Sequence, residues 1–503
     1  MVPECESTPP KFETNGWGLW ALPEDGGRCS RLTPLGDSCV PESFHLNQTQ
    51  SCSSWVYETD NSIISEFGLA CQEWKRTLVG TVHSAGMFFA LALTAYVSDA
   101  FGRRSAFILT AVSAGVVGVC RAFSNSYTLY VVLEFVEATV GSGVYSTGFI
   151  LALEMVGLEQ RVLGGNIISC TFAIGQVMVA LVAWAVPYWR TLTLIIYAPS
   201  ILFVLYCFAL QESVRWLLSK GRKKEAAAII FKAASINKKK LSPATIKQLT
   251  EETDDSSKSV QETVTPVASE VPKKQSLFIQ VIRSKTLVSR LCICSFWWIT
   301  LTFIYYGLSI NSVSLAGNSY VNYILTSLVE IPGYAISVVT LDRFGRKSSI
   351  ITAFFICGIA LIALPFVPYI VSLSALVDCN LSTGIQWLQI TLNMIGKLSI
   401  SMAFSSIYIY TSELMPTEVR HSLLGACSMF GRIGSLLAPQ TPLLMEYWES
   451  LPYLIFGIMA VTSGLLMLLT PETLRVRLPD TVQQAENINI APRTKHKTDI
   501  IVD

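Results

Sequence analysis

The sequence predicts an all-α membrane protein that is built from two pseudo-symmetric helical bundles. Three observations predict this fold class. Only 15% of the 503 residues are charged, whereas a soluble globular chain carries roughly 25%. Apolar blocks of about 20 residues, the length of a bilayer-spanning helix, recur along the chain. Polar motifs of the first half also reappear in the same order in the second half.

The N-terminal segment, residues 1–77, is predicted to be an extracellular loop. It is polar, holds five cysteines and contains the glycosylation acceptor Asn47-Gln48-Thr49. Cysteines in such a segment fit a disulfide-bearing loop outside the cell, and an odd count leaves one thiol free or paired elsewhere. No cleavable signal peptide is visible at its start.

Eleven apolar blocks are predicted to cross the bilayer as helices. Five of them form an N-terminal bundle over residues 78–211, and six form a C-terminal bundle over residues 288–471. Their approximate ranges are 78–98, 105–122, 127–153, 163–187, 191–210, 288–309, 319–341, 348–370, 384–411, 421–444 and 450–470. Several blocks are rich in Gly, Ser and Thr, as expected where helices pack closely.

The loop between the bundles, residues 212–287, and the tail, residues 472–503, are predicted to be cytoplasmic. The loop begins with a basic amphipathic helix over residues 222–240, which would lie on the membrane surface. Residues 242–274, rich in Ser, Thr, Glu and Lys, are predicted to be flexible, and the tail after Arg475 is predicted to be disordered.

The orientation follows from the positions of Lys and Arg. These residues gather in the loops of one face, whereas the opposite loops, residues 311–318 and 366–383, contain neither. The basic face is therefore expected in the cytoplasm. This places the cysteine-rich N-terminal segment outside, in agreement with its glycosylation acceptor.

Three pairs of motifs relate the two halves. Asp99-Ala-Phe-Gly-Arg-Arg104 matches Asp342-Arg-Phe-Gly-Arg-Lys347. A Glu and an Arg seven residues apart follow in each half, and each bundle ends in a polar tripeptide with Glu at its centre. Repeats of this kind are typical of transporters whose two halves rock against each other.

The repeated motifs are predicted to form a conformational switch. The glycine of each loop permits a tight turn, and charge pairs would hold one conformation closed and break in the other. The alternative is that the basic residues only set membrane orientation. The predicted switch residues are Asp99, Gly102, Arg103, Arg104, Glu154, Arg161, Glu212, Arg215, Asp342, Gly345, Arg346, Glu413, Arg420 and Glu472.

Comparison of the halves also predicts an absent helix. Two apolar blocks precede the Asp342 motif, but only one precedes the Asp99 motif. Residues 1–76 hold no apolar stretch long enough to supply the other block. We therefore expect that a helix is missing before Met1.

Nearly the whole chain resembles the major facilitator superfamily, and in particular solute carrier family 22, the organic cation, organic anion and carnitine transporters. The motifs that carry the resemblance are Trp55-Val-Tyr57, Glu73-Trp74-Lys75, Ser98 to Arg104, Glu212 to Leu217, Tyr305 to Leu308, Glu330-Ile-Pro332, Gly396-Lys397, Tyr410 to Thr417 and Pro471-Glu-Thr473. The resemblance implies a major facilitator fold of twelve helices and a substrate site at the bilayer midplane between the halves. The chain departs from the family pattern at Glu134, where many of these proteins have Arg, and at Ala95, Gln211 and Val214.

Aromatic residues of one predicted helix are candidates for the substrate site. Trp298 and Tyr305 lie two turns apart on one helical face, and Tyr306 lies about 100° further round. Such rings suit a cation by cation–π contact. Tyr408, in the span that ends near Glu413, is a further candidate. The alternative for these residues is an aromatic packing stripe.

Three charged residues inside predicted spans, Glu330, Lys397 and Arg432, are also candidates, because burying charge in lipid is costly. By resemblance, organic anion and carnitine transporters carry Arg at the position of Arg432, and cation-selective transporters carry Asp. Arginine can hold a carboxylate with two parallel hydrogen bonds, and Glu330 could attract a cationic head or a coupling ion. The set would suit a zwitterion such as carnitine. The alternative is internal pairing, for example of Lys397 with a carboxylate.

Nothing in the sequence argues for an enzyme, a cofactor or a metal. No Gly-rich phosphate loop precedes a helix, and the four histidines show no metal-ligand spacing. The scattered basic residues give no nucleic-acid surface. We therefore expect transport of small organic ions or zwitterions by alternating access across the plasma membrane, driven by gradients or exchange, with H⁺ or Na⁺ as candidate coupling ions.

The competing interpretation is a truncated isoform that does not transport, or a regulatory partner of a longer transporter. It follows from the expected absent helix, which would line the central cavity. A channel or a receptor is a third interpretation, but neither predicts duplicated switch loops.

Overall fold

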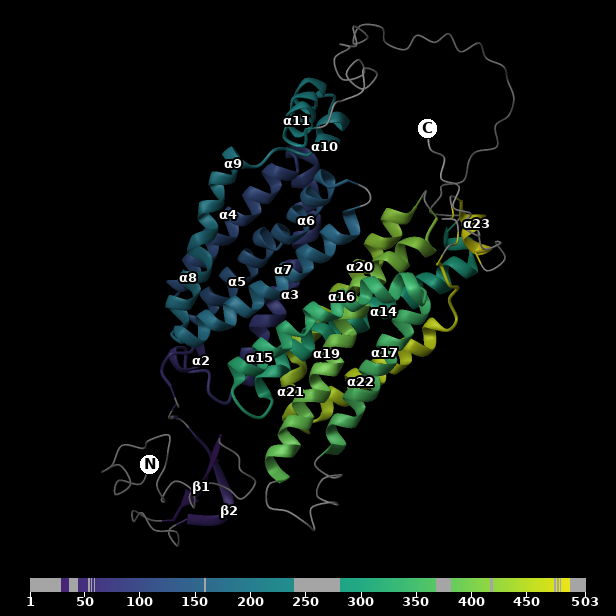
Figure 1. Cartoon of the computed structure of the whole chain (residues 1–503). Coiled ribbons are helices and arrows are strands. Elements are labelled where there is room, and N and C mark those ends of the chain that lie inside the picture. The colour runs from purple at the N-terminus through teal and green to yellow at the C-terminus, as the bar shows by residue number, and fades with distance from the viewer. Residues whose placement is uncertain are drawn as a thin grey trace, which may run out of the picture.

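The computed structural model describes residues 29–35, 44–52, 55, 57, 59–157, 160–238, 281–367, 381–416, 419–474, 476, 479 and 481–488. Within these residues the chain forms two groups of long helices and one small sheet, which lies at one end of the molecule (Figure 1).

The sheet belongs to the predicted extracellular segment. Strand β1 (Ser30–Pro34) pairs antiparallel with β2 (Phe44–Ser51), on which Asn47 is exposed. A disulfide between Cys29 and Cys71 ties the hairpin to the chain just before the first long helix. The segment therefore carries a disulfide, as its cysteines predict, and glycosylation of Asn47 stays a prediction.

The described residues of the first half form five helical spans. The short helix α2 (Ile63–Glu66) precedes them. The spans are α3 (Glu73–Phe101), α4 (Arg103–Ala122), α5 (Tyr127–Gly141) with α6 (Gly143–Met155), α7 (Arg161–Ala185), and α8 (Trp189–Ile201) with η4 (Leu202–Leu205) and α9 (Tyr206–Ala209).

In the second half, the part that the structure describes forms six spans. They are α14 (Lys285–Asn311) with η6 (Ser312–Ser314), α15 (Ser319–Leu328) with α16 (Glu330–Arg343), α17 (Arg346–Ala363) with η7 (Leu364–Phe366), α19 (Leu381–Leu414), α20 (Arg420–Leu437) with η8 (Ala438–Gln440) and α21 (Thr441–Met445), and α22 (Leu451–Met467).

Each of the eleven predicted ranges thus contains helix where the structure describes it, and the ranges 163–187, 191–210 and 450–470 run one to three residues past the end of their helices. Among the described residues, nine helical segments are long and apolar enough to cross a membrane, and α22 is a shorter apolar helix. The remaining range is occupied by α20, η8 and α21. The prediction of an all-α protein with two helical bundles is confirmed, and the helix expected before Met1 stays a prediction.

The span formed by α15 and α16 is discontinuous. Pro332 has no amide hydrogen, so it cannot bond to the carbonyl of Leu328, where α15 ends. Glu330 therefore occupies the first turn of α16, where the helix dipole stabilises a carboxylate. The break places an acidic side chain in the middle of a span.

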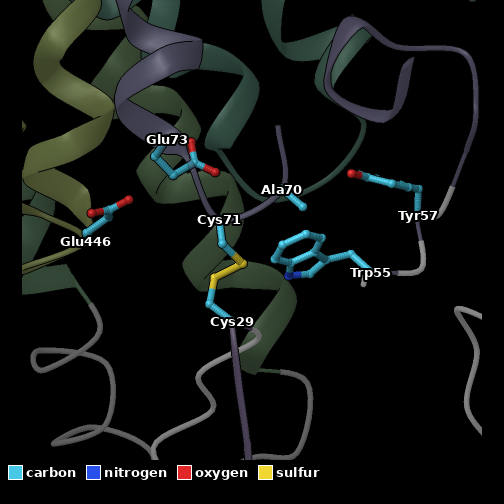
Figure 2. A pocket seen from close by; sticks show the side chains of 7 residues that line it. All are labelled: Cys29, Trp55, Tyr57, Ala70, Cys71, Glu73 and Glu446. Carbon is cyan, nitrogen blue, oxygen red and sulfur yellow. A yellow bond between two sulfur atoms is a disulfide. The ribbon is translucent and has the colours of Figure 1, made fainter. Parts of the chain in front are cut away.

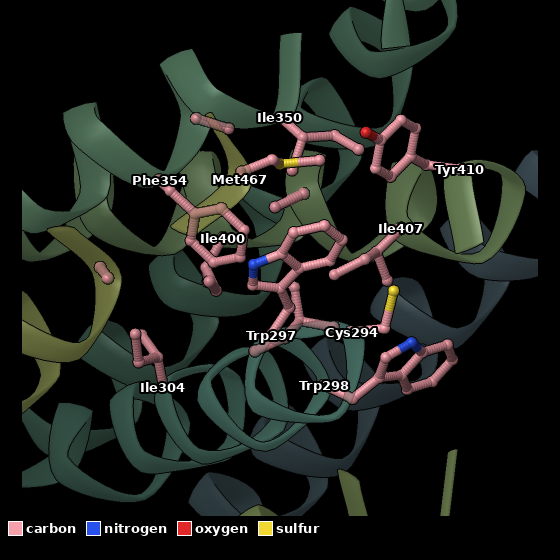
Figure 3. Packing of buried hydrophobic residues seen from close by; sticks show 14 of the residues in the cluster. Cys294, Trp297, Trp298, Ile304, Ile350, Phe354, Ile400, Ile407, Tyr410 and Met467 are labelled. Carbon is pink, nitrogen blue, oxygen red and sulfur yellow. The ribbon is translucent and has the colours of Figure 1, made fainter. Parts of the chain in front are cut away.

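The core of the second half is densely packed around Trp297 of α14. This side chain is fully buried among residues of α17, α19 and α22 (Figure 3), including Phe354, Ile400 and Met467. Neighbouring Trp298 points to a different side, toward α19 and α20. The two adjacent indoles therefore lie on different faces of α14 and pack against different helices.

The two halves meet at one end and diverge at the other (Figure 1). Thr77 Oγ1 of α3 donates to Gln440 Oε1 at 3.3 Å, and Ser84 Oγ donates to the Ser435 carbonyl at 2.9 Å. The helix α7 also packs against α15 and α16. These contacts lie toward the predicted extracellular end, while the ribbons separate on the side of α10 (Val214–Ser219) and α23 (Val482–Glu486) (Figure 1).

Two further segments bear on the sequence predictions. Helices α10 (Val214–Ser219) and α11 (Lys223–Ile236) follow the first half, and α11 occupies the range predicted as an amphipathic helix. The residues predicted to be flexible, 242–274, lie outside the described residues.

The prediction of disorder after Arg475 is wrong in one part. Residues Val482–Glu486 form α23, with Val482 and Ala485 buried. Arg290 at the start of α14 donates to the Ala485 carbonyl. Burial of these apolar side chains outweighs the polar composition of the tail, because apolar burial stabilises by about 25 cal/mol per Å².

Candidate functional site

Glu330 and Lys397 form a buried ion pair between α16 and α19. The Lys397 Nζ lies 3.0 Å from Glu330 Oε1, and both side chains are 0% exposed. The Tyr305 and Tyr334 hydroxyls donate to Glu330 Oε2 at 2.7 Å and 3.2 Å. This is the internal charge pair that the sequence left as the alternative to substrate contact.

The ammonium group of Lys397 is satisfied on its other sides as well. It donates to the Tyr305 carbonyl at 3.0 Å and to Ser309 Oγ at 2.7 Å. It also lies 3.5 Å from the centroid of the Tyr305 ring, within the range of a cation–π contact. Fully hydrogen-bonded pairs of this kind can be buried because the attraction offsets the loss of hydration.

The pair is connected to the first half through Gln176 of α7. The Gln176 Nε2 donates to Glu330 Oε2 at 3.3 Å, and Ser327 Oγ donates to Gln176 Oε1 at 3.5 Å. The hydrogen bonds of this network therefore depend on how the two halves are placed relative to each other. Sequence reasoning missed Gln176, because a single uncharged polar residue in an apolar span is common and carries no distinctive signal.

The aromatic candidates divide into packed and accessible rings. Trp298 and Tyr305 are 1% and 4% exposed, and the Trp298 indole donates to Thr411 Oγ1 at 3.2 Å. Tyr306 is half-buried and Tyr408 is 42% exposed although both lie within spans. The packing alternative thus describes Trp298 and Tyr305, while Tyr306 and Tyr408 present accessible surface.

Arg432 lies on α20 beside this accessible surface. It is half-buried and close enough to Tyr408 for electrostatic interaction. Within the described part of the chain, its guanidinium has neither an ion pair nor a hydrogen bond. A charge so placed among apolar helices is costly without a partner, so the site can accept a negatively charged group.

Small residues beside Arg432 bring α14 close to α20. A Cβ added to Gly434 would lie 2.3 Å from the Ile299 carbonyl oxygen, and one added to Gly431 would lie 3.3 Å from the Trp298 ring. These two glycines therefore allow the close approach of α14 to α20. The close approach sets Arg432 next to the face of α14 that carries the aromatic candidates.

The switch loop of the first half joins three helices and the residues that follow α9. Arg103 lies 2.8 Å from Asp99 and its Nε lies 3.7 Å from Glu154 Oε2. Glu212 Oε1 accepts the backbone N–H of Arg103 at 2.9 Å and of Arg104 at 3.1 Å, so a carboxylate caps the N-terminus of α4.

The second half repeats the arrangement. Arg346 lies 3.1 Å from Asp342 and 3.6 Å from Glu413, and Glu472 accepts the backbone N–H of Arg346 at 2.9 Å. Gly345 has φ +98°, and a Cβ there would lie 2.6 Å from Glu472 Oε2. The turn therefore requires glycine for both its backbone angle and its close carboxylate.

Four predicted switch residues remain to be placed. Gly102 matches Gly345, with φ +100°. Arg215 is exposed on α10, and Arg420 donates to the Met415 carbonyl at 3.3 Å. The side chain of Arg161 lies outside the described residues.

A cavity of about 450 Å³ opens where the disulfide meets the second half (Figure 2). Trp55 and Tyr57 line one side of it, and the carboxylates of Glu73 and Glu446 line another. The cavity lies at the predicted outer face, apart from Arg432.

Comparison with known proteins identifies the family. The profile of the Major Facilitator Superfamily matches residues 62–439. The chain belongs to this superfamily. The facilitator fold is also seen in the xylose transporter XylE from E. coli, in a partially occluded inward-open conformation, with a TM-score of 0.59 and 16% identity over 82% of this chain and 93% of that chain.

Relatives place this facilitator protein in solute carrier family 22. The organic cation transporter protein of Drosophila melanogaster is 35% identical over 460 residues, which cover 90% of this chain and 79% of the relative. Solute carrier family 22 member 3 of Mus musculus is 30% identical over 458 residues, which cover 90% of this chain and 77% of the relative. The protein is therefore a multi-pass membrane transporter of organic ions and not an enzyme, as the sequence predicts.

Proposed function

We propose that this protein carries small organic ions or zwitterions, such as carnitine, across the plasma membrane by alternating access. The observation that supports this proposal most directly is the unpaired charge of Arg432. This cation is half-buried, has no partner among the described residues, and lies beside the accessible ring of Tyr408. Gradients or exchange drive the cycle, with H⁺ or Na⁺ as a coupling ion.

The charges of the site favour a substrate that carries a carboxylate. Lys397 is neutralised by Glu330, so Arg432 supplies the uncompensated charge near the accessible aromatic rings. A carboxylate would bond to Arg432 in two places, and Tyr306 and Tyr408 would contact a quaternary ammonium group by cation–π attraction. A zwitterion satisfies both features at once.

Glu330 and Lys397 would act on substrate only after their mutual bond loosens. In this conformation both are fully buried and bonded to each other. Gln176 reaches Glu330 from the first half, so rocking of the halves would change the surroundings of the pair. We assign the two residues to the site as groups that respond to the conformational cycle, together with the switch loops.

The test is uptake into cells that express the chain, with labelled L-carnitine, tetraethylammonium and hippurate as a zwitterion, a cation and an anion. Arg432→Asp should lower carnitine and hippurate uptake roughly 10- to 100-fold, since hydrogen bonds to charged groups contribute about 1.5–3 kcal/mol. Arg432→Lys is the matched control, because it keeps the charge and loses the paired hydrogen bonds.

Three outcomes separate the interpretations. A shift of preference from carnitine to tetraethylammonium in Arg432→Asp, with a smaller loss in Arg432→Lys, supports the site. Unchanged selectivity at equal surface expression refutes it. No uptake of any of the three solutes by the surface-expressed chain refutes the transport proposal and favours the regulatory or truncated alternative.

A further inference from the structure

Four ionisable side chains from three helices of the first half meet within the spans, apart from Arg432. His83 Nδ1 on α3 lies 2.8 Å from Glu134 Oε1 and 3.8 Å from Glu137 Oε2, both on α5. Arg121 of α4 contacts Glu134. The Glu134 and Glu137 side chains are 10% and 8% exposed, and His83 is 35% exposed. We call this group the histidine cluster.

The charges of the histidine cluster do not balance unless it binds a proton. Arginine stays protonated in proteins, so Arg121 offsets one of the two carboxylates. The second carboxylate leaves one negative charge in a region where uncompensated charge is costly. One proton, on His83 or on Glu137, brings the cluster to neutrality.

The surroundings of Glu137 are a second, independent indication that the cluster binds a proton. Its Oε2 atom is buried and has no hydrogen-bond partner among the described residues. A buried carboxylate oxygen without a partner is destabilising, whereas a protonated carboxyl carries no charge and can donate. His83 is the most exposed member of the cluster, so it can pass a proton between the surroundings and the buried acid.

The same geometry disfavours a metal ion. The three ligand atoms of His83, Glu134 and Glu137 lie within 4.8 Å of one another. However, Arg121 already contacts Glu134 and places a positive charge beside the site. Hard cations such as Ca²⁺ also take six to eight oxygen ligands, which this group does not offer. A proton needs no such coordination shell.

The histidine cluster adjoins the contact between the halves. Ser84, the residue after His83, donates to the Ser435 carbonyl of α20 at 2.9 Å. Ser435 Oγ in turn donates to the Arg432 carbonyl at 2.8 Å. The cluster therefore borders the contact between α3 and α20, and the helix on the other side of that contact carries Arg432.

That contact is closely packed. A Cβ on Gly80 of α3 would lie 2.7 Å from Pro439 Cβ of η8. The titratable groups that face His83 and Glu137 are Arg121 of α4, Tyr130 and Glu134 of α5, and Tyr197 of α8. From the second half, Ser435, Pro439 and Gln440 meet α3 here, and none of them titrates.

We propose that His83, Glu134 and Glu137 form a binding site for a single proton, and that this proton stabilises the packed contact between α3 and α20. The neutral cluster tolerates the closed arrangement. Loss of the proton leaves a net negative charge that is better solvated when the contact opens. The consequence for transport rests on the proposed function, whereas proton binding itself does not.

The first experiment detects the proton directly. Infrared difference spectra of the purified full chain between acidic and alkaline pH report the protonation of carboxyl and imidazole groups. The proteins compared are wild type, His83→Gln, Glu137→Gln, and the control His45→Gln, whose histidine is exposed on β2. We expect a titrating signal in wild type and His45→Gln that is lost or shifted in the other two. Identical spectra in all four folded proteins would overturn the proposal.

The second experiment tests the link to transport. Uptake of tetraethylammonium, whose charge does not change with pH, and of L-carnitine is measured across a range of external pH. Wild type and His45→Gln should share a pH profile that flattens in His83→Gln and Glu137→Gln. A profile that all four proteins share refutes the coupling to the contact. A titrating infrared signal without uptake of any solute retains the proton site and refutes the proposed function.

Discussion

Replacing Glu330 by Gln tests whether water is excluded from the Glu330–Lys397 pair, as its complete burial indicates. The substitution keeps the side-chain shape but leaves Lys397 without its counter-charge. At 3.0 Å the attraction amounts to about 5–6 kcal/mol at an effective dielectric constant near 20. Breaking a buried pair by removing one partner costs about 3–5 kcal/mol. Because Ser309 and the Tyr305 carbonyl still bond to Lys397, we expect a loss near the lower value, about 3 kcal/mol.

The assay is thermal and denaturant-induced unfolding of the purified protein in detergent, arranged as a double-mutant cycle. Glu330→Gln and Lys397→Met should each destabilise, and the double variant should recover much of the loss, since it leaves no lone buried charge. The control is Glu225→Gln. Glu225 pairs with Arg222 on an exposed surface, with side chains 56% and 49% exposed, and such a pair contributes only about 0.3–0.5 kcal/mol.

Two results would refute the reasoning. Strictly additive effects of the two single substitutions would show that the groups do not interact. A loss in Glu330→Gln as small as that in Glu225→Gln would show that water reaches Lys397 and replaces the lost carboxylate.

Three further predictions concern the turn, the outer surface and the loop. Gly345→Ala should destabilise by about 1–3 kcal/mol, seen as a lower unfolding temperature, because the positive φ is strained for alanine and the new Cβ meets Glu472. The Arg190 guanidinium beside Glu66 holds the pKa of that carboxyl below its usual range, with a further contribution from the Trp189 indole that donates to it. The stability that the carboxylate contributes is therefore present at neutral pH and lost as pH falls through the lowered pKa, and Arg190→Gln should reduce this acid dependence of unfolding. Cys71→Ser should destabilise the loop by about 4 kcal/mol, because the disulfide closes a separation of 42 residues, and limited proteolysis should then cleave the loop faster.

Matched variants control these predictions. Gly425→Ala adds a Cβ that meets nothing within 4 Å, so it should leave stability unchanged; an equal loss in both alanine variants would contradict the turn argument. Cys52→Ser removes a thiol that is free among the described cysteines, and it should not accelerate proteolysis. If acid unfolding is the same with and without Arg190, the pairing with Glu66 contributes no stability.

The helices of this protein were predictable because a bilayer leaves the backbone few choices. Every N–H and C=O group in lipid must be bonded internally, so an apolar run of span length becomes a helix. The boundaries differ mainly where a proline or a polar break intervenes, as at Pro332 between α15 and α16. The helix α23 escaped prediction because five residues are too few to show a periodic pattern.

The interaction partners of the charged residues were harder to predict from the sequence. Glu330, Lys397 and Arg432 could each be singled out, because a charge in an apolar span is conspicuous. Which of them pair depends on how α14, α16, α19 and α20 pack, and no local pattern encodes that. Glu137 lies one turn after Glu134 in an apolar span and could have been singled out by the same rule, but its meeting with His83 rests on the packing of α3 against α5.

The duplicated loops act within each half in this conformation. Arg103 reaches Glu154 and Arg346 reaches Glu413, in each case inside one bundle, at 3.7 Å and 3.6 Å. The shorter contacts are those of Glu212 and Glu472 with backbone N–H groups, which fix each turn to the end of its own bundle. In this conformation the loops therefore connect residues within each bundle, and the contacts that join the bundles are formed elsewhere, by α3, α7 and their partners.

We propose that a switch built from these loops works by exchange of partners. When the end that is separated here closes, Arg103 or Arg346 would leave a carboxylate of its own half and meet a group of the other half. The distances to Glu154 and Glu413 are long, so breaking these ion pairs costs little free energy. Ion pairs of this kind at partly exposed sites contribute roughly 1 kcal/mol or less. The caps on α4 and α17 can remain in place throughout, which keeps each bundle intact while the bundles move.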